Sequence, residues 1–410
     1  MRAPILLFLL AAFAAPATAQ QLIVSPAGPY TTITAAVAAV TPGATIIVRA
    51  GIYREPPIEL RVPSVSIVGE GWPVLDGQGT HGMLVIRADD ATVRGLEFTN
   101  TGISHMEDRS AVRVIESSRC TIADNRFRDA LFAIYLQRSD SCEVRGNDIQ
   151  ATGRDETSNG NGIHLWHSPN TRVIENRVTG QRDGIYFEFS RGSRAVGNVS
   201  EGNRRYGLHF MFSDSCLYEN NRFEANGAGV AVMYSKGVQM RGNAFLESKG
   251  SAAYGLLLKD ITDGAISGNR FEGNSTGLYL EGASRLEIAN NSFRGNGWAV
   301  RLMADAEDNR FTGNIFAVNA FDVATNSRTL RSTFEGNWWD AYRGYDLDRD
   351  GAGDVPFHPV RLFALVVERH PEAILLLRSP VTLLLDAAER VFPVLTPSLA
   401  DPRPLMRVPR

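Results

Sequence analysis

Short segments in which hydrophobic and polar residues alternate recur along most of this 410-residue chain. In one of them, YGLHFMFSDS (206–215), an extended strand directs Leu208, Phe210 and Phe212 to one side. His209 and Met211 then point to the other side. Alternation of this kind indicates strands with one face in a core. The segment therefore places a histidine and a methionine on the face away from its core.

The alternating segments belong to an internal repeat marked by asparagine. The motif runs from DNRF at 124 to GNWW at 336, and its asparagines are Asn125, Asn147, Asn176, Asn198, Asn221, Asn243, Asn269, Asn291, Asn314 and Asn337. Their spacings are 22, 29, 22, 23, 22, 26, 22, 23 and 23 residues. Short strands at this period, with no helical period between them, predict an all-β fold, a single-stranded right-handed parallel β-helix with coils of about 22 residues. The asparagines are expected to form a side-chain ladder at a turn.

The two ends of the chain differ from the repeat. Residues 31–40 (TTITAAVAAV) are helix-like and are expected to cap the first coil. Residues 360–392 are strongly apolar, but charges interrupt every run, so they do not predict a membrane span. Pro371 and Pro380 divide them into short helices. These helices either cap the last coil or dock on a membrane partner, and the proline-rich tail that follows favours docking.

These features divide the chain into four parts. Residues 1–19 resemble a secretory signal peptide, with one arginine, an apolar run and a small-residue cleavage site. Residues 20–342 form the β-helix, 343–358 an Asp-rich loop, and 359–410 the capping or docking segment. The net charge of −3 predicts binding neither to nucleic acid nor to an anionic membrane.

Aligned coils show which residues stack on the outward face. One outward column reads Tyr135, His164, Tyr186, His209, Ala231, Leu257, Tyr279 and Arg301. A second column, two residues further on, reads Gln137, Trp166, Glu188, Met211, Met233, Lys259, Glu281 and Met303. His164, Glu188, His209, Met211 and Met233 thus collect on one sheet over four consecutive coils.

Imidazole and thioether together suit a soft or borderline metal, above all Cu(I). Insertions at 99–110, 151–161 and 246–255 leave one corner of the coils, and the first carries His105 and Met106 beside this sheet. His164 and His209 are two coils apart, about 9 Å, too far to share one ion without movement. The alternative is an apolar face that packs under a loop or a partner, where methionine and aromatic residues are common.

A second candidate metal site follows the last strand. Asp346, Asp348, Asp350 and Asp354 have the spacing of the first nine positions of an EF-hand loop, and Gly351 fits its sharp turn. Phe357 stands where the bidentate glutamate belongs. The loop predicts either a calcium site or a tight turn held by its own aspartates.

The three cysteines, Cys120, Cys142 and Cys216, share one place in the repeat. Their alignment with apolar residues favours a buried ladder. A bridge between the stacked Cys120 and Cys142, or a thiol metal site, is the alternative.

Several of these segments together resemble a known family. GIHLWHS (162–168), DGIYFEFS (183–190), YGLHFMFSDS, GNWWDAYRGYDLDRDGAGDVP (336–356) and the tail are similar to the periplasmic β-helix proteins of nitrous oxide reductase maturation, the NosD family. The resemblance covers essentially the whole mature chain, and the tail and the YGLHFMFS strand are its more specific parts.

The resemblance implies a role that the columns alone do not. It implies a non-enzymatic periplasmic component of an ABC-type complex with a membrane permease and a cytoplasmic ATPase, associated with the membrane through these partners. Such a protein handles copper, received from a lipoprotein chaperone, for the copper centres of nitrous oxide reductase. The resemblance fixes no ligand residue by residue.

Two other functions fit a β-helix. One is a polysaccharide lyase, hydrolase or uronate epimerase, with His164 or His209 as the base of an epimerase. Hydrolysis needs two carboxylates roughly 5–10 Å apart, whereas Glu188 and Glu281 are four coils, near 19 Å, apart. The other is a passive structural or adhesive solenoid.

Overall fold

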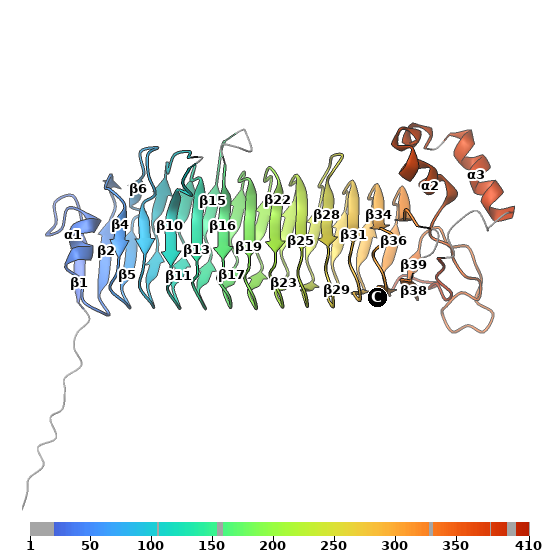
Figure 1. Ribbon diagram of the computed structural model, residues 1–410, viewed down its shortest axis with the longest axis horizontal. Helices are drawn as coiled ribbons and strands as arrows, with labels where there is room; N and C mark the ends of the chain where they lie inside the picture. Colours follow the sequence, from blue (N-terminus) through green and yellow to red (C-terminus); the bar gives the residue numbers. More distant parts are fainter. Residues whose placement is uncertain are drawn as a thin grey trace, which may run out of the picture.

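The computed structural model describes residues 20–104, 106–153, 159–327, 331–377, 379–391 and 399–409. The predicted signal peptide (1–19) and His105 lie outside the described residues. The described chain winds into a rod whose coils each add one strand to three long parallel sheets (Figure 1). The predicted fold class, a parallel β-helix with short helices at its C-terminal end, is confirmed.

Sheet A contains 14 strands within the described residues. They are β1 (Gln21–Val24), β2 (Thr45–Arg49), β5 (Ser66–Glu70), β8 (Thr92–Arg94), β11 (Thr121–Ala123), β14 (Glu143–Arg145), β17 (Arg172–Ile174), β20 (Arg194–Val196), β23 (Leu217–Glu219), β26 (Gln239–Arg241), β29 (Ala265–Ser267), β32 (Glu287–Ala289), β35 (Arg310–Thr312) and β38 (Thr333–Glu335).

Sheet B contains 13 strands in the same part of the chain. They are β3 (Ile52–Tyr53), β6 (Val74–Asp76), β9 (Glu97–Thr99), β12 (Arg126–Arg128), β15 (Asp148–Gln150), β18 (Arg177–Thr179), β21 (Val199–Glu201), β24 (Arg222–Glu224), β27 (Ala244–Leu246), β30 (Arg270–Glu272), β33 (Ser292–Arg294), β36 (Ile315–Ala317) and β39 (Trp338–Trp339).

Sheet C, which carries the candidate site, contains 12 described strands, mostly of six residues. They are β4 (Ile58–Leu60), β7 (Leu84–Ile86), β10 (Ser110–Ile115), β13 (Phe132–Gln137), β16 (Asn161–Trp166), β19 (Asp183–Glu188), β22 (Tyr206–Met211), β25 (Ala228–Met233), β28 (Tyr254–Lys259), β31 (Thr276–Glu281), β34 (Trp298–Leu302) and β37 (Phe321–Ala324).

The core is a set of identical side chains stacked along the rod. Phe245, Phe271, Phe293 and Phe316 form one buried stack, with ring centroids 4.6–5.1 Å apart. The three cysteines lie in this core as free, buried thiols. Burial raises the pKa of Cys216 to about 12, so its thiol stays protonated and unreactive at neutral pH.

The predicted asparagine ladder is present and joins consecutive coils. The Oδ1 of Asn147 accepts hydrogen bonds from the backbone N–H of Asn125 (3.1 Å) and from its Nδ2 (3.2 Å). The Nδ2 of Asn125 also donates to the carbonyl of Val93. The same side-chain bond repeats at 2.9–3.0 Å from Asn147 to Asn337. Each asparagine is buried and satisfied by its neighbours.

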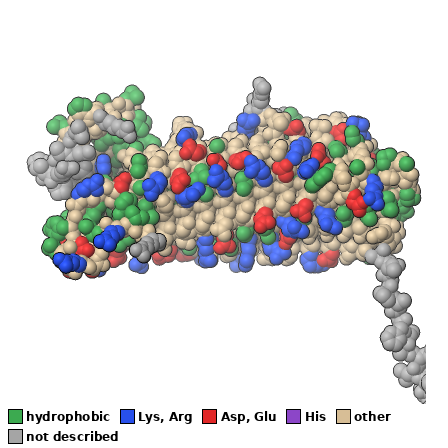
Figure 2. Space-filling model, turned by 180° about the vertical axis from the view of Figure 1, so that it is seen from behind, with side chains coloured by type: hydrophobic (Ala, Val, Ile, Leu, Met, Phe, Trp, Pro, Cys, Tyr) green, Lys and Arg blue, Asp and Glu red, His purple; other side chains and the backbone are tan. Residues whose placement is uncertain are grey.

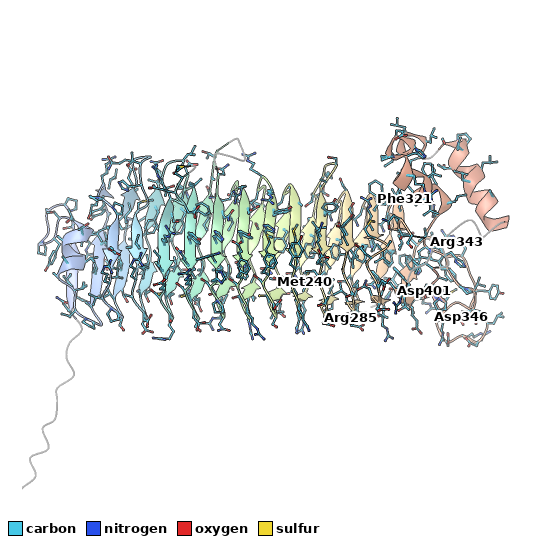
Figure 3. The ribbon with its side chains drawn as sticks, in the orientation of Figure 1. Met240, Arg285, Phe321, Arg343, Asp346 and Asp401 are labelled. Atoms are coloured by element: carbon cyan, nitrogen blue, oxygen red, sulfur yellow. The ribbon has the colours of Figure 1, made fainter. Side chains whose placement is uncertain are left out.

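A residue from the C-terminal tail ends this ladder. The buried carboxylate of Asp401 accepts from the Nδ2 of Asn337 (3.1 Å), its backbone N–H (2.9 Å) and the indole Nε1 of Trp339 (3.1 Å). It also accepts from the backbone N–H of Gly336. Asp401 therefore stands where the asparagine of a further coil would stand (Figure 3).

Helices close the two ends of the rod differently. At the N-terminus α1 (Ile33–Ala38), capped by Thr32, buries Ile33 and Ala36 against the first coil. At the C-terminus α2 (Leu362–Arg369) packs on β37, where the ring centroids of Phe363 and Phe321 are 6.0 Å apart. The 3-10 helix Pro371–Leu376 and α3 (Pro380–Val391) follow, and each begins at its proline.

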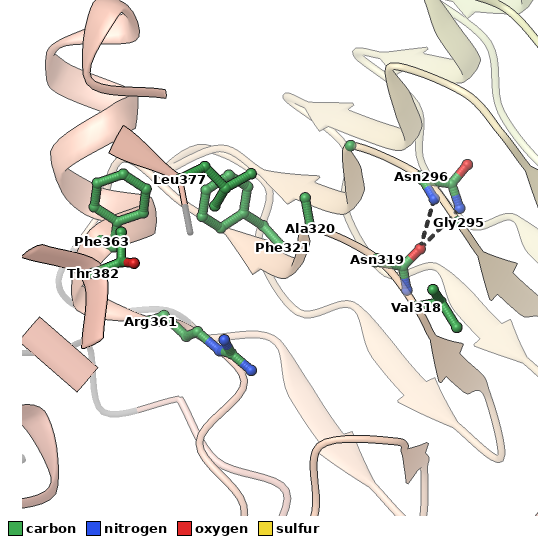
Figure 4. Close-up of a pocket in the computed structure, with 11 residues that line it drawn as sticks. Gly295, Asn296, Val318, Asn319, Ala320, Phe321, Arg361, Phe363, Leu377 and Thr382 are labelled. Carbon is green, nitrogen blue, oxygen red and sulfur yellow. Dashed lines mark hydrogen bonds between the residues drawn. The ribbon is translucent and has the colours of Figure 1, made fainter. Parts of the chain in front are cut away.

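The C-terminal helices leave a cavity and an apolar surface. A cavity of about 520 Å³ lies between the last coils and the helices, lined by Asn319, Phe321, Phe363 and Leu377 among others (Figure 4). Leu375 and Leu384 are 87% and 71% exposed. In the part of the chain that the structure describes, no helix has both the length and the apolar character needed to cross a membrane.

We predict that Asp401→Ala destabilises the rod by about 3 kcal/mol or more, since it leaves several buried donors without a charged acceptor. Thermal unfolding of the signal-free chain measures this change. Asp305→Ala is the control, because Asp305 is an exposed aspartate in the turn after β34. Equal melting temperatures for the two variants would contradict the ladder-ending role.

A second prediction concerns Asp322 in β37. Burial raises its pKa from 3.8 to about 6, although Asn319 donates a hydrogen bond to it. The folded state therefore binds more protons than the unfolded chain between pH 4 and 6, so stability falls as pH rises through this window. We expect Asp322→Asn to be more stable than the parent by about 1–3 kcal/mol at pH 7.5 and equally stable at pH 4. Melting curves across this range test the prediction, with Asp305→Asn as a variant that leaves the pH profile unchanged.

Candidate metal centre

The strand register of sheet C confirms the two predicted outward columns. In the first column His164 pairs with Tyr186, Tyr186 with His209, and His209 with Ala231. Glu188 pairs with Met211, and Met211 with Met233, in the second column. The five candidate ligands of this sheet therefore lie on β16, β19, β22 and β25, one coil after another.

A third outward column was missed from the sequence. Tyr206 lies three residues before His209, yet their rings are 4.7 Å apart on the outer side. Gly207 causes this: a Cβ there would come within 2.6 Å of the Nδ2 of Asn226, so the glycine faces inward and shifts the alternation. Asp183 pairs with Tyr206 and joins this column. The available signal was the glycine that recurs at this place of the coil as Gly162, Gly184, Gly207, Gly229, Gly255 and Gly277.

Ring stacking buries both histidines, contrary to the expectation of an exposed face. His164 lies between Tyr135 (4.5 Å) and Tyr186 (4.8 Å), and His209 stacks on Tyr186 at 4.6 Å. The exposed fractions are 8% for His164 and 3% for His209. The ring of Tyr186 separates the two imidazoles, so they do not meet at one point.

Burial also sets the charge of these imidazoles. Neither ring nitrogen of His164 or His209 has a hydrogen-bond partner among the described residues. Burial, followed by the positive charges of Arg205 and Arg182, lowers the pKa of His209 to about 3. Burial likewise lowers the pKa of His164, although Glu188 opposes it from 3.8 Å. Both imidazoles are therefore neutral at pH 7, the form in which histidine binds metals.

The two methionines lie at the open edge of this stack. Met211 and Met233 are half-buried neighbours on adjacent strands. The hydroxyl of Tyr186 donates to the sulfur of Met211 at 3.4 Å. Met211 is two residues from His209 on the same face of β22, so the imidazole and the two thioethers lie on one face of two adjacent strands.

The first insertion contributes less to this group. Met106 is 94% exposed, and its backbone N–H is held by the hydroxyl of Ser104. The neighbouring residue His105 lies outside the described residues. The first two insertions meet at the corner before sheet C, where Ile103, Leu131 and Asn159 line a cavity of about 210 Å³.

Phe212 corrects the initial assignment of the segment YGLHFMFS. Leu208 and Phe210 are fully buried, as expected, but Phe212 is 43% exposed. Strand β22 ends at Met211, and Phe212 takes a positive φ of 51° at the turn. The alternation stops with the strand, so the ring points to solvent.

The Asp-rich loop brings three of its four aspartates together. Carboxylate oxygens of Asp346, Asp348 and Asp350 lie within 4.8 Å of one another. Asp354 instead accepts from the backbone N–H of Leu347 at 2.6 Å. Arg403 of the tail pairs with Asp350. Gly351 has a φ of 92°, which supports its predicted place at the sharp turn.

The two glutamates of the second outward column do not form the carboxylate pair that the hydrolase alternative needs. Glu188 and Glu281 lie in one column with Met211, Met233 and Lys259 between them, four coils apart. At about 4.8 Å per coil this separation is near 19 Å, beyond the range that glycoside hydrolysis uses.

Comparisons with solved structures support the fold. A catalytic domain of a GH87 α-1,3-glucanase aligns with a TM-score of 0.61 over 80% of this chain and 70% of its own, at 14% identity. PfbA, a surface adhesin of Streptococcus pneumoniae, aligns with a TM-score of 0.54 over 72% and 87%, at 12% identity. At these identities the likeness shows the β-helix and nothing of the activity.

Sequence comparisons identify the family. Residues 148–344 match the family described as periplasmic copper-binding protein (NosD). A probable ABC transporter binding protein NosD of Stutzerimonas stutzeri is 31% identical over 376 residues, 87% of this chain and 84% of the relative. The protein of the same name from Pseudomonas aeruginosa is 33% identical over 355 residues, 82% of each chain. Both are named as binding proteins, which agrees with the expected non-enzymatic role. The chain belongs to the NosD family of periplasmic copper-binding proteins.

Proposed function

We propose that this chain binds copper on the outward face of sheet C, at His209, Met211 and Met233, and hands it on for nitrous oxide reductase maturation. One observation carries the proposal: a buried, neutral imidazole without a hydrogen-bond partner lies beside two thioethers on adjacent strands. A buried polar group normally has a partner. A metal ion would supply one for His209.

The residues fit copper as cargo better than other ions. Two thioethers and an imidazole suit Cu(I), and hard cations prefer oxygen ligands. Tyr186 holds the sulfur of Met211 through its hydroxyl and covers one face of His209. His164 and Glu188 lie one to two coils away and would form a second, weaker position along the same face. Met106 would add a ligand only if the loop moved towards the sheet, and His105, which lies outside the described residues, remains a proposed ligand.

We further propose that the chain works as the periplasmic part of an ABC transporter complex with a permease and a cytoplasmic ATPase. Both relatives are named as probable ABC transporter binding proteins, which supports this role. The exposed leucines of the C-terminal helices, Leu375, Leu376 and Leu384, would dock on the membrane partner. Figure 2 shows apolar side chains gathered at this end, whereas basic and acidic side chains intermingle along the rod. A lipoprotein chaperone would supply the copper and the reductase would receive it.

We predict that the signal-free protein binds Cu(I) tightly under anaerobic competition with a chelator, and that His209→Ala/Met211→Ala loses at least tenfold in affinity. Loss of two of the three proposed ligands should weaken the binding free energy by more than the 1.4 kcal/mol that corresponds to a tenfold change in the dissociation constant.

The matched control is His370→Ala/Met406→Ala, which removes a histidine and a methionine at the C-terminal end, each at least partly exposed. Met106→Ala separately tests the loop. Equal Cu(I) affinity in the parent and the sheet C variant, with both folded, would refute the site.

The clustered oxygens of Asp346, Asp348 and Asp350 support a second candidate function, a calcium site that ties the loop to the tail. The loop contacts the tail through Gly353 N–H to Pro404 O (2.7 Å) and Met406 N–H to Gly351 O (3.0 Å). Calcium would act there as a structural ion.

We predict that Ca²⁺ at a hundredfold excess over its dissociation constant stabilises the parent by about 2.7 kcal/mol. Asp346→Asn/Asp348→Asn should abolish this gain, and Mg²⁺ should not replace Ca²⁺. Differential scanning calorimetry with and without a chelator measures the effect. An equal melting temperature with and without calcium would contradict the calcium site and would show that the aspartates serve only to hold the turn.

A further inference from the structure

An exposed row of stacked rings borders the proposed copper site. His167, Phe189, Phe212 and Tyr234 directly follow the last residues of β16, β19, β22 and β25, and together form what we call the aromatic stripe. Neighbouring rings lie 4.7, 5.0 and 5.1 Å apart and within 13° of parallel. Phe189, Phe212 and Tyr234 are 41–43% exposed. A continuous apolar row on a surface indicates an interaction site.

The backbone holds these rings in an unfavourable conformation. All four residues have a positive φ of 48–54°, a region that bulky residues rarely occupy. The same corner carries Arg138 in the coil before the stripe, and Asp260 and Gly282 in the coils after it. Behind the stripe, Ser190 and Ser213 form a buried ladder that fixes the turn. Because this conformation recurs at the same corner in neighbouring coils with other residues, it belongs to the turn, and the stripe is distinguished by its ring side chains.

The stripe is continuous with the proposed copper ligands. Phe212 follows Met211 and Tyr234 follows Met233, so the stripe begins where the two methionines end their strands. The other side of the site is closed, because Tyr186 and Tyr206 pack on His209. The stripe therefore borders the edge of the site at which the two sulfurs are half-buried.

The ring geometry selects the kind of partner. A sugar stacks on a free ring face, but here the faces contact each other and only the edges are open. The neighbours Trp166 and Arg138, in cation-π contact at 5.1 Å, extend the stripe. Aromatic residues, methionine and arginine are the residues enriched in protein–protein interfaces.

We propose that the aromatic stripe is the docking surface for a folded copper-donating protein. An apolar rim around the donor's metal would cover the stripe together with Met211 and Met233 during exchange. This inference rests on the proposed copper function and adds the partner's place on the molecule.

The test is Phe189→Asn/Phe212→Asn, because asparagine tolerates positive φ and keeps the turn. The probe is the lipid-free, Cu(I)-loaded chaperone lipoprotein. We expect its dissociation constant to rise at least about tenfold, the effect of losing an interface hot spot. Cu(I) affinity in chelator competition should change less than about twofold, within a few tenths of a kcal/mol. Val318→Asn is the control, because Val318 is also exposed (71%) with a φ of 58°, far from the stripe.

Unchanged donor binding by the folded double variant would overturn the docking surface. The parent could bind no Cu(I) in chelator competition while the double variant still shows weaker binding to the donor protein. In that case the docking surface stands and the copper site fails. Binding of the parent to phospholipid vesicles, lost in the variant while donor binding persists, would overturn the proposal in favour of a membrane contact.

Discussion

Hydrogen bonding between coils fixes every other feature of this molecule. Each strand pairs in parallel with the strands one coil before and after it, and the asparagine ladder repeats the same link at the turn. A one-residue slip would break the ladder and send every side chain of a strand to the opposite face. His209 would then point into the core and Leu208 to the outside. The ladder therefore sets the positions of the candidate copper ligands although it lies at a different place in the coil.

The sequence predicted the features that recur in every coil. It missed the features that depend on a single residue that departs from the repeat. Asparagine spacing and strand alternation gave the coils, the columns and the pairing of Met211 with Met233 correctly. Gly207 interrupts the alternation within one strand, and Phe212 lies just past a strand end, so a strict period of two misses the third outward column and misplaces Phe212. Asp401 joins the ladder from 64 residues away, a contact that no local pattern contains. Burial of the histidines required knowing that tyrosines pack on both imidazoles, with Tyr135 and Tyr186 on His164 and Tyr186 and Tyr206 on His209.

The stacked tyrosines give the candidate site its chemical character. An exposed histidine would titrate near neutral pH and would bond to water. Packed against Tyr186 and Tyr206, His209 loses water, stays neutral and keeps its nitrogens unpartnered. The sulfurs at the edge remain half-buried and so remain reachable. A site built in this way combines a preformed, desolvated ligand with flexible thioethers, which suits an ion that must be both held and released.

The rod also separates the tasks that the proposed function requires. The candidate ligands lie on β16 to β25, whereas the apolar C-terminal helices pack on β37, five strands beyond β22 in sheet C. At about 4.8 Å per strand this distance is near 24 Å. Every coil is hydrogen-bonded to the next, so the intervening coils form one continuous connection between the two regions. A partner at the C-terminal end would therefore set the height at which the candidate copper ligands and the aromatic stripe stand above it. Exchange of copper with a second protein would then depend on the orientation of the whole rod, and no local rearrangement of its strands would be needed.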